Sequence, residues 1–281
     1  MKKISLLIII AFLIITGACK SSQTVEKKIG FLKNRAEDTL RQVDLFVFAV
    51  GINEYSNNLF PDLKYAANDA KNICNIFKAQ EGKFFRKVNT ILISDNADIK
   101  PTTENILSNL LFFDEVRPND TVIFFAASHR IIIDGEFYLM TSDSQYNDNE
   151  GFVLESFINI NDVLSALDMP AYKIFIIDTN ASEIANGGDF TVLRACKEDQ
   201  KAIENNFYNG GLLTTSILEA FEKAETKNDV ITLNDLLNYV VLRVEEMSNN
   251  QQTPLYNLAS EAGDLIMGSK VNLKNIGINI P

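Results

Sequence analysis

The segment Val122-Ile-Phe-Phe-Ala-Ala-Ser-His129-Arg130 decides the fold of this chain. Its run of apolar and β-branched residues, bounded by polar ones, predicts a strand that is buried on both faces. Such strands belong to open parallel sheets, where ligands and chemistry gather beyond the carboxyl ends of the strands. The run ends at His129, the only histidine in 281 residues. We therefore expect His129 to lie at the functional edge of a parallel sheet.

Similar apolar runs occur on both sides of this segment and predict further strands at 45–50, 88–93, 173–178 and 191–195. Between the runs, apolar residues recur at helical spacing, for example at Ala66, Ala70 and Ile73, or at Leu213, Ile217 and Phe221. Strands that alternate with helices predict an α/β fold with a mostly parallel central sheet and helices on both faces. About 230 residues from Val43 onward fit one domain.

Local signals place several boundaries. Asp134-Gly135 predicts a two-residue hairpin turn, and Thr232 to Asp235 predicts a capping box for the last helix, which buries Leu236, Leu237, Val240 and Val244. A helix that opens at Pro101 is expected to turn Ile106, Leu107, Leu110 and Leu111 inward. Asn161-Asp162 is expected to cap a short helix that ends before Pro170, and the polar stretch 197–209 is expected to be a mobile loop.

The first residues have the order of a secretory signal: Lys2 and Lys3, an apolar run from 4 to 15, and Thr16-Gly-Ala-Cys19. The cysteine directly after small residues makes the segment resemble a bacterial lipoprotein signal, which implies lipidation of Cys19. The alternative is an ordinary signal peptide with an incidental cysteine. We predict a signal over 1–18, a tether over 19–42, a domain over 43–268 and a tail over 269–281. This predicts a lipid-anchored protein of the bacterial cell envelope, facing the periplasm or the surface.

Charge and cysteine content narrow the choice of partners. Removal of Lys2 and Lys3 with the signal leaves 24 basic against 37 acidic residues, a net charge near −13. This excess argues against nucleic acid as a partner. With Cys19 lipidated, only Cys74 and Cys196 remain, too few for a disulfide framework. No run of acidic residues has the spacing of a metal site, and no cofactor is expected.

Several blocks of the domain resemble the caspase-like peptidase family in its bacterial, metacaspase-related form. Thr121 to His129 is similar to the strand that carries the family's catalytic histidine, and Phe175 to Asn180 to the strand that carries its catalytic cysteine. Five further blocks follow the family's order: Ala49–Tyr55, Leu63–Ala70, Val192–Gln200, Gly210–Thr214, and Gln252–Pro254 followed by Gly263-Asp264. The resemblance covers about residues 43–268 and implies a three-layer caspase-like sandwich.

In this family a cysteine thiolate attacks the peptide carbonyl and a histidine moves the protons. Here His129 and position 180 are 51 residues apart, close to the family's spacing of about fifty, but position 180 is asparagine. An amide has no proton of low pKa to lose, so Asn180 cannot replace a thiolate. Ser128 and Arg130 also stand where the family has glycines. Ser182 and Cys196 are the alternative nucleophiles that the chain offers near this position.

The resemblance also implies a pocket for a basic side chain. In the metacaspase-like branch two acids determine this preference, and both are present, as Asp69 and Asp178. Alternatively, Asp69 stabilises a helix start and Asp178 ties down a loop. We therefore expect a membrane-anchored, catalytically silent pseudopeptidase that binds a peptide or protein partner, one containing Lys or Arg if the basic-residue pocket is retained. The alternatives are an active or residual cysteine-type endopeptidase or hydrolase, using Ser182 or Cys196 with His129, and a structural scaffold lipoprotein.

Overall fold

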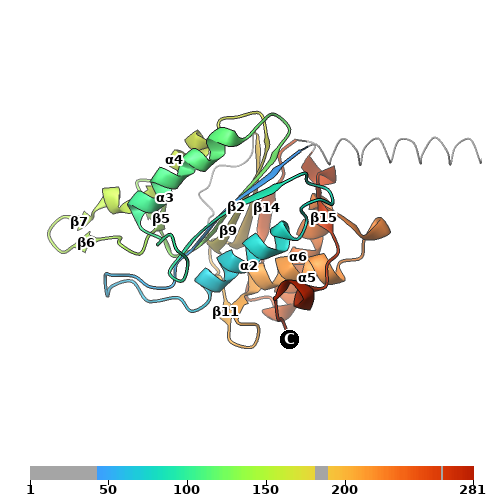
Figure 1. Ribbon diagram of the computed structural model, residues 1–281. Coiled ribbons are helices and arrows are strands. Elements are labelled where there is room, and N and C mark those ends of the chain that lie inside the picture. Colours follow the sequence, from blue (N-terminus) through green and yellow to red (C-terminus); the bar gives the residue numbers. More distant parts are fainter. Residues whose placement is uncertain (1–42, 181–188, 261) are drawn as a thin grey trace, which may run out of the picture. The chain divides into compact units, whose positions relative to one another are not determined.

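A six-stranded sheet forms the centre of the molecule in the computed structural model, which describes residues 43–180, 189–260 and 262–281 (Figure 1). The strand order is β14-β10-β9-β3-β1-β2. These strands are β1 (Leu45–Gly51), β2 (Val88–Ser94), β3 (Thr121–Ala127), β9 (Tyr172–Asn180), β10 (Phe190–Cys196) and β14 (Leu255–Asn257). All neighbours are parallel except β14, which runs antiparallel to β10 at one edge. The predicted parallel sheet is confirmed.

Alternate residues of β1 bury on opposite faces of the sheet, as a strand's two-residue period requires. Leu45, Val47 and Ala49 pack in a core with three helices: α2 (Ala66–Lys78), α5 (Leu212–Lys223) and α6 (Leu233–Met247). Phe46, Phe48 and Val50 pack on the other face, against α3 (Thr103–Asn109), a 3₁₀ turn η1 (Leu110–Glu115) and α4 (Ile160–Ala166). Figure 1 shows these two helical layers on either side of the sheet. The predicted three-layer architecture is confirmed.

The chain also forms several smaller sheets and 3₁₀ turns outside the central sheet. One small sheet contains β4 (Arg130–Ile133), β5 (Glu136–Met140) and β8 (Phe157–Asn159). Three two-stranded pairs are β6–β7 (Tyr146–Asn147, Gly151–Phe152), β11–β12 (Glu204–Asn205, Gly210–Gly211) and β13–β15 (Val230–Thr232, Ile266–Ser269). The 3₁₀ turns are η2 (Leu154–Ser156), η3 (Lys227–Asp229), η4 (Ala262–Asp264) and η5 (Leu273–Ile276).

Two local predictions are confirmed in detail. Asp134 and Gly135 both have positive φ, 53° and 81°, as the two-residue turn between β4 and β5 requires. At the start of α6, Thr232 Oγ1 accepts from the Asp235 backbone N–H, and Asp235 Oδ2 accepts from the Thr232 N–H. Both turn chemistry and capping are local, so sequence alone suffices to predict them.

Two other predictions are wrong. Ile106 and Leu110 are buried as predicted, but Leu107, which lies within α3, and Leu111, where the chain has tightened into η1, are 38% and 70% exposed. A 3₁₀ turn has three residues per turn, so the buried positions become Leu110 and Phe113. In addition, α4 is capped by Asn159, whose side chain accepts from the Asn161 N–H, rather than by Asn161-Asp162.

The segment after residue 268 lies against the helical layer. The Val271 N–H donates to the Phe221 carbonyl at 2.9 Å, and Leu273 and Ile278 are buried in the core shared with α2 and α5. None of the helices within the described ranges is both long and apolar enough to cross a membrane. The predicted signal, tether and Cys19 lie outside the described residues and remain predictions.

Candidate functional site

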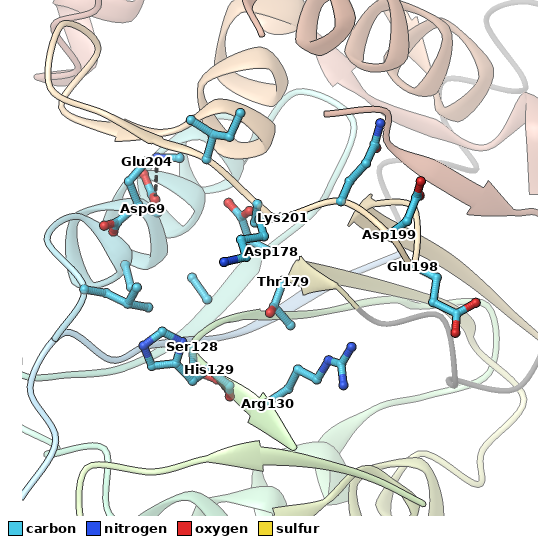
Figure 2. Close-up of a pocket in the computed structure, with 17 residues that line it drawn as sticks. Asp69, Ser128, His129, Arg130, Asp178, Thr179, Glu198, Asp199, Lys201 and Glu204 are labelled. Atoms are coloured by element: carbon cyan, nitrogen blue, oxygen red, sulfur yellow. Dashed lines mark hydrogen bonds between the residues drawn. The ribbon is translucent and has the colours of Figure 1, made fainter. Parts of the chain in front are cut away.

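The carboxyl ends of β3 and β9 open into a pocket of about 490 Å³ (Figure 2). The two strands pair in parallel register up to Ala126 and Ile177, so the residues that follow them emerge at the same edge. The pocket is lined by His129 and Arg130 after β3, by Asp178 and Thr179 of β9, by Asp69 of α2, and by residues 198–204. The structure therefore brings together His129, Asp69 and Asp178, which were singled out from the sequence.

Four hydrogen bonds fix His129 and its backbone, one of them from the Met140 N–H to the His129 carbonyl at 2.9 Å. Its backbone N–H donates to the Tyr55 hydroxyl at 2.9 Å, and its carbonyl accepts from the Ser128 hydroxyl at 2.9 Å. The ring Nε2 lies 2.7 Å from the Pro61 carbonyl oxygen. Because a carbonyl can only accept, this contact assigns the proton to Nε2 and leaves Nδ1 as the basic nitrogen of the neutral ring. The histidine is thus held in one tautomer, as a proton-transfer group requires.

Asp69 lies in the first turn of α2 and is 3% exposed. Its Oδ2 accepts a hydrogen bond from the Gly211 N–H at 2.9 Å, the one donor to this carboxylate among the described residues. Burial, followed by the negative charge of Asp178, raises the pKa of Asp69 well above its usual value. A buried carboxylate with so little compensation has a strong need for a proton or a cation.

Asp178 approaches from the end of β9. Its Oδ2 accepts from the Thr214 hydroxyl at 2.9 Å, in the first turn of α5. Burial raises its pKa to about 6, although hydrogen bonds from Thr214 oppose that rise. A Cβ atom at Gly211 would lie 2.7 Å from Asp178 Oδ2 and 3.1 Å from Asp69 Oδ2, so only glycine fits between the two carboxylates.

The stretch 197–209 covers the pocket and is not the loose loop expected from its polarity. Glu204 accepts hydrogen bonds from the backbone N–H groups of Lys64, at 3.0 Å, and Tyr65, at 2.7 Å, at the start of α2. The side chain of Gln252 accepts from the Ile203 N–H, and that of Gln200 from the Thr253 N–H. Glu204 was missed because its partners are about 140 residues away. In the sequence, the apolar residues Ala202 and Ile203 were the signal that could have indicated an anchored loop.

The pocket carries more negative than positive side chains. Two cations, Arg130 and Lys201, face five carboxylic acids: Asp69, Asp178, Glu198, Asp199 and Glu204. Glu204 also raises the pKa of both buried aspartic acids. Within the described residues, no group of three or more His, Cys, Asp or Glu side chains is arranged to hold a metal ion. The arrangement suits an organic cation.

The nucleophile position lies at the last residue of β9, where the backbone of Asn180 pairs with Cys196 of β10 after a register shift that follows Arg194. Cys196 is fully buried, and burial, followed by the charge of Asp178, raises its pKa to about 12. The other described cysteine, Cys74, is also buried, with its pKa raised to about 12. Neither thiol ionises near neutral pH, as a nucleophile must. Ser182 lies outside the described residues.

Comparison with known proteins agrees with this architecture. The family model of the Caspase domain matches residues 46–265. The chain belongs to the caspase domain family. No curated protein matches the chain significantly.

Among solved structures, the caspase domain resembles caspase-1 from Spodoptera frugiperda, with a TM-score of 0.54 and 14% identity, over 82% of this chain and 91% of that one. Protein GSU0716 from Geobacter sulfurreducens superposes with a TM-score of 0.58 and 10% identity, over 81% of this chain and all of that one. Likeness at such low identity shows the fold alone. The predicted family and its α/β sandwich are confirmed.

Proposed function

We propose that this caspase-domain protein lacks peptidase activity and binds a peptide or protein partner through a Lys or Arg side chain. One observation carries the proposal. The carboxylates of Asp69, which is buried, and Asp178, which is half-buried, line one pocket with an oriented His129, while the residue that ends β9 is Asn180. This arrangement supports a pocket for a basic side chain that lacks the family's nucleophile.

The absence of activity follows from the chemistry of the available groups. An asparagine amide is not a nucleophile at neutral pH, and His129 cannot make it one. Cys196 is a buried thiol whose pKa of about 12 keeps it protonated. These properties count against a residual hydrolase that uses Cys196.

The preference for a basic ligand follows from charge. Lys and Arg side chains would add charge-assisted hydrogen bonds to carboxylates whose present donors, the Gly211 N–H for Asp69 and Thr214 for Asp178, are uncharged. A cation between Asp69 and Asp178 would relieve their mutual repulsion, which now raises the pKa of Asp69. The partner would be held at the bacterial envelope if Cys19 is lipidated. Loss of detergent-phase partitioning in Cys19→Ser, with wild type retained there, tests the anchor.

Restoring the nucleophile tests the proposal directly. Asn180→Cys, alone and combined with Ser128→Gly and Arg130→Gly, should gain cleavage of fluorogenic peptides after Lys or Arg. Asn180→Ala is the matched control and should remain silent, and His129→Ala in the Asn180→Cys background should abolish the gain. If the wild-type protein itself cleaves such peptides, and His129→Ala stops it, the proposed lack of activity is wrong.

Binding is tested separately by titration of wild-type protein with lysyl and arginyl peptides. Binding that is lost in Asp178→Asn supports a working pocket. No binding at millimolar peptide would favour the scaffold function instead.

A further inference from the structure

The pocket that is lined by Asp69 and Asp178 is also lined by the cationic side chain of Arg130. Arg130 follows His129 directly and lines the same cavity as Asp69 and Asp178. In Figure 2 the two aspartic acids lie on one side of the pocket and Arg130 on the other, with Thr179 between them. Arg130 is half-buried, whereas Glu198 and Asp199 at the mouth are exposed and therefore screened by solvent.

An arginine in this place is unfavourable for a ligand that brings only positive charge. Like charges in a partly desolvated cavity repel each other more strongly than at the surface. The repulsion becomes attraction if the ligand also carries a carboxylate. The guanidinium presents a planar fork of donors that matches a carboxylate, and it retains further N–H groups for other partners.

We infer that the pocket recognises a basic residue together with its free α-carboxylate, as at the C-terminus of a peptide that ends in Lys or Arg. The side chain would enter between Asp69 and Asp178, and the α-carboxylate would pair with Arg130. This inference rests on the proposed function, because it assumes the basic-side-chain pocket.

The size of the pocket fits this assignment, because a cavity of about 490 Å³ is within the usual range for sites that enclose a small ligand group. Free arginine offers the same two charges as a C-terminal arginine, so both ligand sources share this chemistry.

The test compares matched ligands on the full chain by calorimetry: an acetylated peptide ending in arginine as the free acid, the same peptide as the C-terminal amide, and free arginine. We expect the acid to bind at least about tenfold more tightly than the amide. Arg130→Gln should reduce this ratio to near one, and Arg130→Lys, which keeps the charge without the fork, should give an intermediate ratio. Lys71→Gln, an exposed charge change on α2 outside the pocket, should leave the ratio unchanged.

The outcomes separate this inference from the proposed function. Equal binding of acid and amide by wild type would overturn the inference and leave the basic pocket standing. Absence of binding by all three ligands would overturn both. If folded Arg130→Gln still prefers the acid over the amide, Arg130 is not the residue that binds the α-carboxylate. If that variant does not fold, the wild-type comparison still decides whether the carboxylate is recognised. Tight binding of free arginine would identify an amino-acid site, and binding of the peptide acid alone a peptide terminus.

Discussion

Asp69 of α2 and Asp178 of β9 bury their carboxylates against the same glycine. The Gly211 N–H donates to Asp69 Oδ2 at 2.9 Å, and a Cβ at that glycine would lie 2.7 Å from Asp178 Oδ2. Two like charges held so close in a poorly solvated site favour one shared proton or a bound cation. Desolvation and repulsion therefore make the charged pair costly to the fold.

Asp178→Asn should stabilise the protein while it weakens the binding of basic peptides. The amide oxygen can still accept from the Thr214 hydroxyl, but the repulsion with Asp69 is removed. We expect a gain in unfolding free energy of about 1–3 kcal/mol at pH 7.5, because a tenfold change in proton affinity corresponds to about 1.4 kcal/mol. Urea titration measures the gain. Loss of stability would show that the charged carboxylate supports the fold.

The binding of basic peptides should weaken as the pH falls through about 6. The pKa of Asp178 is raised in the folded protein to about 6, so its carboxylate takes up a proton there that the unfolded chain takes up only near pH 4. Protonation removes the charge that attracts the ligand, yet it adds to folding stability. Calorimetry at pH 5 and 7.5 checks this prediction. The stability difference between wild type and Asp178→Asn should vanish toward pH 4.

Local interactions were predictable from the sequence, and contacts between distant segments were less so. The hairpin at Asp134-Gly135 and the capping box at Thr232 depend on neighbours within four residues. The convergence of His129, Asp69 and Asp178 required the order of parallel strands, which the family resemblance supplied. The inward placement of Leu107 and Leu111 was wrong. No local sequence signal shows where an α-helix tightens into a 3₁₀ turn.

The anchoring of the stretch 197–209 at the pocket could not be predicted from its amino-acid composition. Glu204 stands in a polar stretch, and its role depends on backbone N–H groups at the start of α2 that no sequence pattern links to it. Its position depends on β11, which brings Glu204 to the start of α2. An anchored loop of polar residues is therefore easily mistaken for a mobile one.

Both described cysteines should react slowly with thiol reagents in the folded protein. Cys74 and Cys196 are buried, and each has a pKa raised to about 12, so almost no thiolate exists at pH 7.5. In Cys19→Ser protein, labelling by iodoacetamide should be at least about a hundredfold faster in urea than in buffer. Rapid labelling of Cys196 but not Cys74 in native protein would revive the residual hydrolase.

A buried ion pair between α5 and α6 should dominate the stability of the helical layer. Glu219 is fully buried. Burial disfavours its charge, but hydrogen bonds from Arg243 and Lys223 outweigh burial and lower its pKa. Arg243→Met should cost about 3–5 kcal/mol, because it leaves a buried charge without its main partner. Lys223→Met, which removes a half-exposed partner, should cost about 1 kcal/mol or less. Equal losses in urea unfolding would contradict this ranking.

Glu204 offers a way to separate the anchoring of the pocket cover from its charge. Glu204→Gln keeps one oxygen acceptor for the N–H groups of Lys64 and Tyr65 but loses the negative charge that raises the pKa of both buried aspartic acids. Glu204→Ala loses both. We expect the glutamine variant to retain a resistant 197–209 segment in limited proteolysis and to bind basic peptides about two- to fivefold more weakly. The alanine variant should be cleaved in this segment and lose about 1–2 kcal/mol of stability, since two backbone donors lose their acceptor. If alanine and glutamine behave alike in proteolysis, the hydrogen bonds of Glu204 do not hold the cover in place.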